Sequence, residues 1–163
     1  MNAEQIEALP YRPCVGVMLV NDAGHAFAGQ RIDNHQDAWQ MPQGGVNSGE
    51  APIDAAFREL WEETGVTQDK ATLVSQTQDW IAYDLPYDLV PKIWGGKFRG
   101  QTQLWFLFRF RGEDTDITIE TEHPEFREWA WMPISDLPEK IVPFKRATYD
   151  AVISEFEPLI TWA

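Results

Sequence analysis

The chain has 163 residues, of which 44% are hydrophobic and 13% aromatic, enough for one domain (residues 1–163) with a sizeable core. Its 26 acidic residues against 13 basic ones leave a formal net charge of −13, which argues against sequence-independent binding along a nucleic-acid backbone. No apolar run is as long as a transmembrane helix, no signal peptide is recognisable, and the single Cys14 excludes an internal disulfide. We therefore expect a cytoplasmic protein.

The first part of the chain is predicted to form short strands followed by a helix. In chain order we expect a short helix or frayed arm at 1–9, a strand buried on both faces at 14–20, its hairpin partner at 25–31, a polar loop at 32–37, a short strand at 38–41 and a helix at 52–65.

The second part is predicted to consist mostly of strands and to end in a helix. We expect a strand at 71–83, an unassigned segment up to 100, a strand at 102–111, an acidic loop at 112–124, a strand at 127–132 and a helix at 144–157. The strand at 102–111 has the clearest pattern, because Leu104, Phe106 and Phe108 alternate with side chains of the other face. Strands thus dominate, with two principal helices, so we expect an α/β fold in which helices cover a mixed sheet.

The helix at 52–65 carries an apolar stripe formed by Ile53, Ala56, Phe57 and Leu60. Its ends fit the pattern, since Pro52 suits the first helical position and Gly65 the left-handed position just past the last turn.

Three glutamates of this helix, Glu59, Glu62 and Glu63, are spaced i, i+3 and i+4 and should share a face turned away from the apolar stripe. Like charges at this spacing repel one another, and a divalent cation removes the repulsion while gaining hard oxygen ligands. A solvated acidic helix face is the alternative for these three residues alone.

The sequence around the helix decides between these interpretations. Read from Gly44, the chain has Gly, five residues, Glu50, seven residues, and then Arg58-Glu59-Leu60-Trp61-Glu62-Glu63-Thr64-Gly65-Val66. This stretch (44–66) resembles the complete Nudix box, G-x5-E-x7-R-E-U-x-E-E-x-G-U with U an aliphatic residue, at every fixed position. The resemblance implies the Nudix fold, an α/β/α sandwich with a mixed sheet, and a metal-dependent hydrolase of phosphoric anhydrides.

The resemblance extends beyond the box to one subgroup of the family, over roughly residues 11–157. It rests on short stretches that include Tyr11-Arg12-Pro13, Trp39-Gln40-Met41-Pro42-Gln43-Gly44-Gly45, Gly100-Gln101, Pro124-Glu125-Phe126 and Phe144-Lys145-Arg146. This subgroup contains bacterial RNA pyrophosphohydrolases and the similar dinucleoside tetraphosphate hydrolases.

Three positions depart from the subgroup pattern. Cys14 stands where Asn is usual, and Leu104 stands where Lys is frequent, which weakens the case for strong binding of a long polyphosphate or RNA chain. Ala51 replaces the Ser or Thr that would cap the helix, at an expected cost of roughly 1 kcal/mol of helix stability.

The resemblance implies a set of metal ligands: Glu59, Glu62, Glu63, Glu125 and the backbone carbonyl of Gly44 or Gly45. We expect Mg²⁺, with Mn²⁺ as a substitute. The predicted catalytic set is Glu62, Glu63 and Arg58. Either Glu62 or Glu63 is the general base, and Arg58 is expected to orient the helix through an ion pair with Glu50.

Substrate contacts are predicted at positions outside the box. Arg12 and Arg31, together with Lys97 and Arg99, are candidate phosphate ligands. Tyr83 matches a subgroup position near the phosphates or the base. Phe144 and Lys145 match positions that contact a nucleobase in RNA pyrophosphohydrolases, and a core role for Phe144 is the alternative.

The leading hypothesis is removal of the 5′ triphosphate of RNA to leave a monophosphate, by a monomer or weak oligomer. The close alternative is asymmetrical hydrolysis of diadenosine tetraphosphate to ATP and AMP, which Met41 and the acidic composition favour. A binding module without catalysis and a hydrolase of free nucleotides are further alternatives, although no glutamate of the box is missing.

Overall fold

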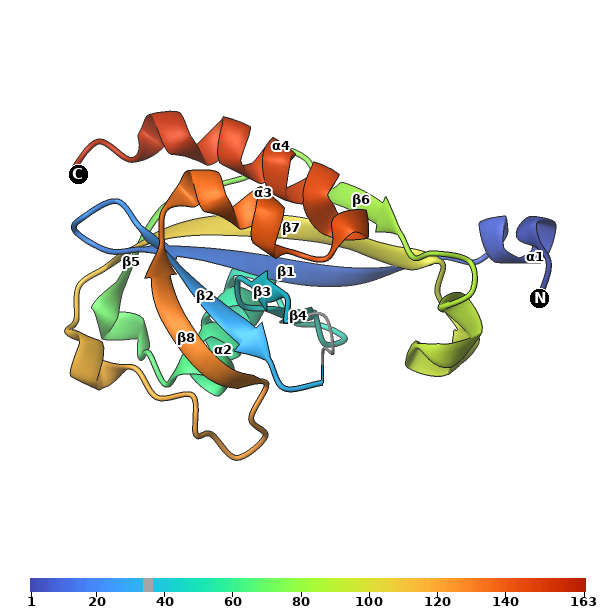
Figure 1. Ribbon diagram of the computed structural model, residues 1–163, viewed down its shortest axis with the longest axis horizontal. Helices are drawn as coiled ribbons and strands as arrows, with labels where there is room; N and C mark the ends of the chain where they lie inside the picture. The colour runs from blue at the N-terminus through green and yellow to red at the C-terminus, as the bar shows by residue number, and fades with distance from the viewer. Residues whose placement is uncertain (34–36) are drawn as a thin grey trace.

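Two long parallel strands form the centre of the molecule, and the computed structural model describes residues 1–33 and 37–163 around them. Strand β1 (Tyr11–Val20) pairs with β7 (Gly100–Phe110) in continuous register, from Tyr11 opposite Gly100 to Val20 opposite Arg109 (Figure 1). The predicted loop at 32–37 lies partly outside the described residues.

The other strands extend this pair into an eight-stranded mixed sheet, as predicted. They are β2 (Ala26–Arg31), β3 (Trp39–Gln40), β4 (Gln43–Gly45), β5 (Ala71–Gln76), β6 (Ile81–Asp84) and β8 (Phe126–Met132). The main path runs β3-β2-β1-β7-β5, while β4 pairs with β1, β6 with β7 and β8 with β2.

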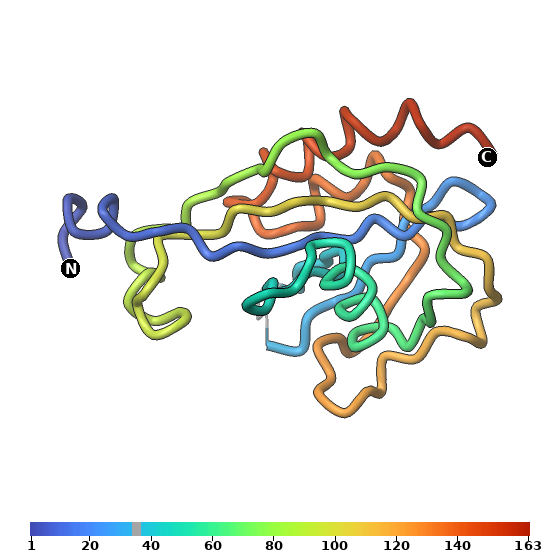
Figure 2. The backbone as a smooth tube through the Cα atoms, turned by 180° about the vertical axis from the view of Figure 1, so that it is seen from behind, coloured from blue at the N-terminus to red at the C-terminus, as the bar shows by residue number. Residues whose placement is uncertain are grey.

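Helices lie on both sides of the central strands. The α-helices are α1 (Ala3–Glu7), α2 (Pro52–Thr64), α3 (Leu137–Lys140) and α4 (Arg146–Phe156). Short 3₁₀ turns are η1 (Gln68–Lys70), η2 (Val90–Lys92), η3 (Trp94–Gly96), η4 (Asp114–Asp116), η5 (Ile134–Asp136), η6 (Pro143–Lys145) and η7 (Glu157–Leu159). Helices α3 and α4 lie above β1 and β7, and α2 lies below them, in both Figure 1 and Figure 2. The predicted α/β/α layering is therefore confirmed.

Both faces of the central strands are buried, which explains their continuous apolar sequences. Along β7, Phe106 and Phe108 pack in the core between the sheet and α2, whereas Trp105 and Leu107 pack in the core between the sheet and α4. Strand β1 alternates in the same way, with Val17 on the α2 side. Two cores on opposite faces of one sheet stabilise the layers mainly through apolar burial.

The predicted strand at 71–83 is interrupted. Gln76 pairs with Phe106 and Ile81 with Gln103, so five steps of chain span three steps of β7 and the intervening residues bulge outward. At the break, the Trp105 N–H donates to the Thr77 hydroxyl (3.1 Å) in place of a ladder bond. Threonine carries a hydroxyl able to replace a backbone acceptor, and the apolar pattern of the segment does not reveal this.

Two further boundaries differ from the prediction. The helix expected at 144–157 begins at Arg146, because Pro143 starts a separate 3₁₀ turn before it. The loop that leads into α2 begins with the short strand β4, which pairs with β1. This pairing brings the glycines of the box beside the first strand.

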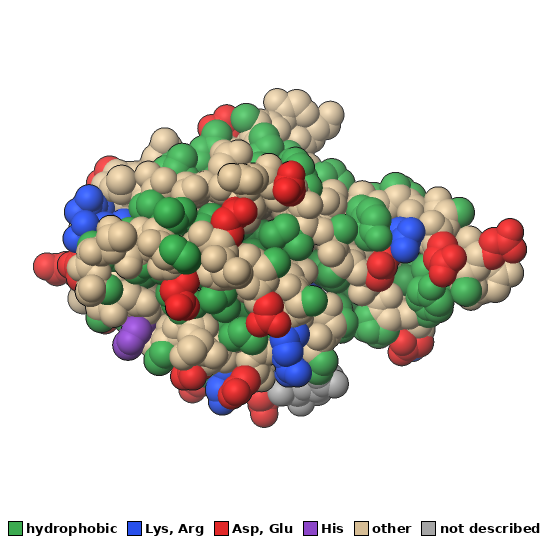
Figure 3. Space-filling model, turned by 90° about the horizontal axis from the view of Figure 1, so that it is seen from above, with side chains coloured by type: hydrophobic (Ala, Val, Ile, Leu, Met, Phe, Trp, Pro, Cys, Tyr) green, Lys and Arg blue, Asp and Glu red, His purple; other side chains and the backbone are tan. Residues whose placement is uncertain are grey.

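Charge and hydropathy at the surface follow the composition. Acidic side chains are spread over the face above α4, with fewer basic side chains between them (Figure 3). Within the described residues, no helix has the length and apolar character needed to cross a membrane.

Candidate active site

A cavity of about 570 Å³ brings together nearly all of the predicted site residues. Its lining includes Arg12, Arg31, Gly44, Glu59, Glu62, Glu63, Tyr83, Glu125, Phe144 and Lys145. These residues come from β1, β2, β4, α2, β6, the loop before β8 and the turn η6. Three of the predicted residues lie outside the lining: Arg58 and the candidate phosphate ligands Lys97 and Arg99.

Helix α2 supplies three of the carboxylates, and its ends follow local sequence rules. Gly65 ends the helix in the left-handed conformation (φ 73°), and its N–H donates to the Trp61 carbonyl (2.8 Å). Ala51 occupies the N-cap and makes no side-chain capping bond, as predicted.

Glu63 is buried even though it lies on the helix face turned away from the apolar stripe. Its carboxylate accepts a hydrogen bond from the backbone N–H of Gln43 (2.9 Å). Burial, with the neighbouring charges of Glu59 and Glu125, raises the pKa of Glu63 well above its ordinary value. The helix turns this side chain toward β4 because the sheet packs beside it.

Glu59 lies against the glycine that opens the box. A Cβ on Gly44 would lie 2.1 Å from the Glu59 carboxyl carbon, so a glycine is required for this close approach. Burial raises the pKa of Glu59, an effect that hydrogen bonding to Arg58 partly offsets. Glu62, in contrast, is about half exposed.

Arg58 lies behind the carboxylates and connects them to the loop. Its guanidinium donates to Glu50 (2.8 and 2.9 Å), to the Gly45 carbonyl (2.7 Å) and to Glu59 (2.8 Å), with a longer contact to Glu62 (3.3 Å). The predicted ion pair of Arg58 with Glu50 is thus present, and the hydrogen bond to the Gly45 carbonyl ties α2 to β4.

The donor set fits a hard divalent cation. Buried Glu63 carries an unfavourable charge beside Glu59 and Glu125, and a cation would neutralise it with oxygen ligands of the preferred type. As positioned, no three acidic, His or Cys side chains of the described residues are close enough to enclose an ion, and Glu59 accepts a hydrogen bond from Arg58. The carboxylates therefore surround the site without forming a closed cage.

Four basic side chains of the described residues line the same cavity: Arg12, Arg31, Lys92 and Lys145. Arg31 forms a two-point ion pair with Asp33 (2.9 and 2.7 Å). Lys145 is buried, and burial together with the charge of Arg31 lowers its pKa to about 8. Neither Arg12 nor Lys145 makes an ion pair with any of the residues that the structure describes, so both retain charge for an anionic ligand.

Aromatic rings complete the wall. Tyr83 is buried with its ring 5.8 Å from that of Phe144, and the Lys145 ammonium lies 5.6 Å from the Tyr83 ring centre. Phe144 is half-buried at the cavity and does not lie in the core beneath α4. Trp94, which the sequence did not single out, also lines the cavity.

Glutamines form part of the lining that sequence reasoning missed. Gln40, Gln43 and Gln101 reach the cavity, and Gln103 donates from one amide nitrogen to Gln43 (3.0 Å) and Gln101 (2.7 Å). The signal was available, because Gln101 and Gln103 are polar positions at the start of an otherwise apolar strand that is buried on both faces. Buried amides must be hydrogen-bonded, so this network holds the cavity wall rigid.

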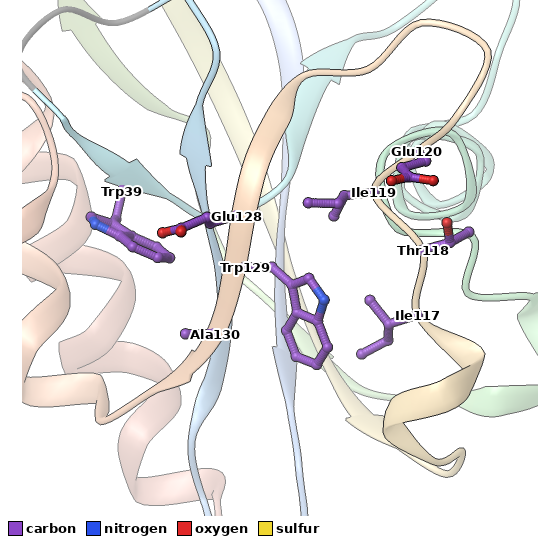
Figure 4. A pocket seen from close by; sticks show the side chains of 8 residues that line it. All are labelled: Trp39, Ile117, Thr118, Ile119, Glu120, Glu128, Trp129 and Ala130. Atoms are coloured by element: carbon purple, nitrogen blue, oxygen red, sulfur yellow. The ribbon is translucent and has the colours of Figure 1, made fainter.

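A second cavity, of about 630 Å³, contains none of the predicted site residues. Figure 4 shows the Trp129 ring between β8 and the loop that carries Ile117 and Ile119, with Trp39 across the strand. Its lining is mainly apolar apart from Glu120, Glu128 and Thr118, and it offers no cation to a phosphate.

The amino-acid sequence is similar to one domain family and to named bacterial proteins. A model described as the NUDIX domain matches residues 10–152. A Roseobacter denitrificans protein named RNA pyrophosphohydrolase is 63% identical over 157 residues, covering 96% of this chain and 98% of that protein. A Rickettsia canadensis protein of the same name is 51% identical over 152 residues, covering 93% of both.

Solved structures share the fold at low sequence identity. A dihydroneopterin triphosphate pyrophosphohydrolase from E. coli superposes with a TM-score of 0.68 at 20% identity, covering 90% of this chain and 99% of that one. An Ap4A hydrolase from C. elegans gives a TM-score of 0.66 at 20% identity, covering 90% and 98%. Because the domain match spans most of the chain and the relatives align almost from end to end, the chain belongs to the Nudix family, as residues 44–66 predict.

Proposed function

We propose that this Nudix hydrolase converts the 5′-triphosphate end of RNA to a monophosphate, releasing pyrophosphate or two successive phosphates. Relatives that are 51–63% identical and bear the name RNA pyrophosphohydrolase support the proposal. The observation that carries it is the shared cavity, in which box carboxylates, basic side chains and aromatic rings all meet. A phosphate chain needs the first two groups, and a terminal base needs the third.

Nudix hydrolases generally require divalent metal ions. The residues that would hold them here are Glu59, Glu62, Glu63 and Glu125, with the carbonyl of Gly44 or Gly45. A bound ion neutralises phosphate charge and lowers the pKa of a bound water. We propose Mg²⁺, with Mn²⁺ as a substitute, because all of these ligands are hard oxygens.

The remaining chemistry is assigned to the protein side chains. Glu62 or Glu63 accepts a proton from the attacking water, whose oxygen forms a bond to phosphorus. The bond from that phosphorus to the bridging oxygen breaks, and the leaving phosphate keeps the electron pair. Arg58 does not touch the substrate in this scheme, because Glu50 and the Gly45 carbonyl already occupy its donors.

Substrate binding is assigned to the side chains on the opposite elements of the cavity. Arg12 and Arg31 offset the charge of the phosphates near Tyr83, and Phe144 and Lys145 contact the first base. The acidic surface supports recognition of the RNA end alone, without binding along the strand. We place the reaction in the cytoplasm and expect a monomer or weak oligomer.

Asymmetrical hydrolysis of diadenosine tetraphosphate is the second candidate, favoured by the acidic composition. The uncharged residue at 104 weakens the case for binding a long polyphosphate or RNA chain less than the sequence indicated. Leu104 packs in the core beneath α2 and is absent from the cavity lining, so the basic groups at the cavity come from other positions.

A competition assay tests the proposal. Purified protein with Mg²⁺ receives 5′-triphosphorylated RNA, diadenosine tetraphosphate and a mononucleoside triphosphate together, and all products are followed. Faster formation of monophosphorylated RNA supports the proposal. Faster formation of ATP and AMP favours the second candidate. Dominant turnover of the mononucleotide indicates a hydrolase of free nucleotides. No turnover of any substrate would indicate a binding module without catalysis.

A further inference from the structure

We propose that Trp94 is a positioning residue for Arg12, and that its indole ring holds the guanidinium where a substrate phosphate binds. The inference deepens the proposed function, because it concerns the same cavity and the same class of anionic ligand.

Arg12 has few other contacts that would fix its position. Its Nη1 donates to the Cys14 thiol (3.2 Å), and sulfur is a weak acceptor. Arg12 forms no ion pair within the described parts of the chain. A Cβ on Gly45 would lie 2.5 Å from Arg12 Nη2, so the guanidinium passes directly over the backbone of the box. A charge placed here without a carboxylate needs another contact to hold it.

Trp94 provides that contact. The Arg12 Cζ lies 5.3 Å from the centre of the Trp94 ring, within the range of a cation–π interaction. Both residues line the cavity. An aromatic ring orients a guanidinium without neutralising it, whereas a carboxylate would compete with the phosphate for the same charge.

The backbone of Trp94 supports a functional reason for the ring. Trp94 has φ 49°, and Gly95 and Gly96 follow with φ 68° and 71°. Two of these three left-handed positions are glycines, as the conformation favours, and the third carries the largest side chain. Bulky residues held in this region are found preferentially at functional sites, where the surrounding structure enforces the conformation.

The N-terminal helix contributes to that enforcement. The Trp94 ring packs against the small core of Ile6, Tyr83, Leu85 and Val90. Helix α1 also holds the neighbouring segment, since the Tyr87 hydroxyl donates to the Glu7 carboxylate (2.6 Å). Figures 1 and 2 both show α1 beside the segment that follows β6. The ring that contacts Arg12 is thus fixed from outside the Nudix box.

The test compares W94F and W94L with the parent protein, alone and combined with R12A. Binding of inorganic triphosphate is measured by calorimetry without added metal, and kcat and KM are measured with triphosphorylated RNA and Mg²⁺. We expect W94L to raise Kd and KM about 3- to 30-fold with little change in kcat, and W94F to retain most of the affinity. In the R12A background, W94L should cause no further loss.

W80L is the matched control, because Trp80 is exposed and does not line the cavity, and it should bind as the parent does. Thermal melting shows that each variant is folded. Equal losses for W94F and W94L, or a W94L loss that persists with R12A, would overturn the inference in favour of simple packing. The binding and turnover measurements separate this inference from the proposed function. A protein that binds triphosphate through Arg12 and Trp94 but leaves RNA intact would contradict the proposed function and not the inference.

Discussion

The Arg58 guanidinium donates two parallel hydrogen bonds to the Glu50 carboxylate, from Nε (2.8 Å) and from Nη2 (2.9 Å). The same Nη2 donates to the Gly45 carbonyl (2.7 Å). One side chain therefore connects helix α2, the loop before it and the strand that carries the glycines of the box. Apart from Glu125, the proposed metal ligands lie on the elements that this contact joins.

Replacing Arg58 with Lys should lower kcat/KM about 10- to 100-fold, the usual effect of losing a group that orients metal ligands. A lysine keeps the charge but cannot form the two-point contact with Glu50 and reach the Gly45 carbonyl together. Steady-state turnover of triphosphorylated RNA measures the effect. R111K is the control, since the exposed Arg111 side chain hydrogen-bonds to Thr72 and does not line the cavity. Full activity in R58K would show that the charge alone suffices.

The same pair predicts a pH dependence of stability. Hydrogen bonds from Arg58 and from the Asn47 backbone lower the pKa of Glu50 from 4.5 to about 2. Because the folded-state pKa is the lower one, the stabilisation is complete above the unfolded pKa and is lost as the pH falls toward 2. Urea unfolding of the parent and E50Q should differ at neutral pH by roughly 1 kcal/mol, with the difference shrinking as the pH falls from about 5 to about 2. A difference that stays constant over this range would contradict the assignment.

Glu63→Gln should have opposite effects on stability and on turnover. Without metal, the variant should melt at a higher temperature, because a buried charge beside Glu59 and Glu125 is removed. Turnover should fall at least about 100-fold, and the stabilisation that Mg²⁺ gives the parent should shrink. Melting curves in EDTA and in Mg²⁺, together with RNA hydrolysis, measure these effects. E139Q, at an exposed position, is the control, and full turnover in E63Q would refute both proposed roles of Glu63.

Two neighbouring glycines should respond differently to alanine. In G44A the new Cβ meets the Glu59 carboxylate at 2.1 Å, so activity should require more Mg²⁺ and kcat should fall. In G45A it meets the end of Arg12 at 2.5 Å, so KM should rise instead. Each clash involves the far end of a flexible side chain, and both variants should remain folded. A Mg²⁺ titration of kcat and KM for each variant separates the effects, and identical profiles would contradict them.

Ala51→Ser should stabilise the protein without changing its activity. The N-cap backbone is extended (φ −71°, ψ 142°) and lacks a side-chain acceptor for the first turn of α2. A serine hydroxyl should add about 1 kcal/mol, or a melting temperature about 2–4 °C higher. A51V is the matched control, because it adds volume without an acceptor. An unchanged melting temperature in A51S would show that the first turn is already satisfied.

Local patterns in the sequence determined the helix that carries the glutamates, the partnership of Arg58 with Glu50, the burial of β1 on both faces and the position of the strand β7. Each depends on the periodicity of neighbouring residues or on a contiguous motif, so adjacent residues encode it. The family and the layered fold follow from the same information.

The tertiary structure decided which way side chains turn and which distant segments meet. Glu63 is buried because β4 packs beside α2 and offers a backbone N–H of Gln43, and a backbone donor has no sequence signature. Trp94 meets Arg12 across a separation of more than half the chain. Such contacts join elements that are remote in sequence, so they form only when strand pairing and packing bring those elements together.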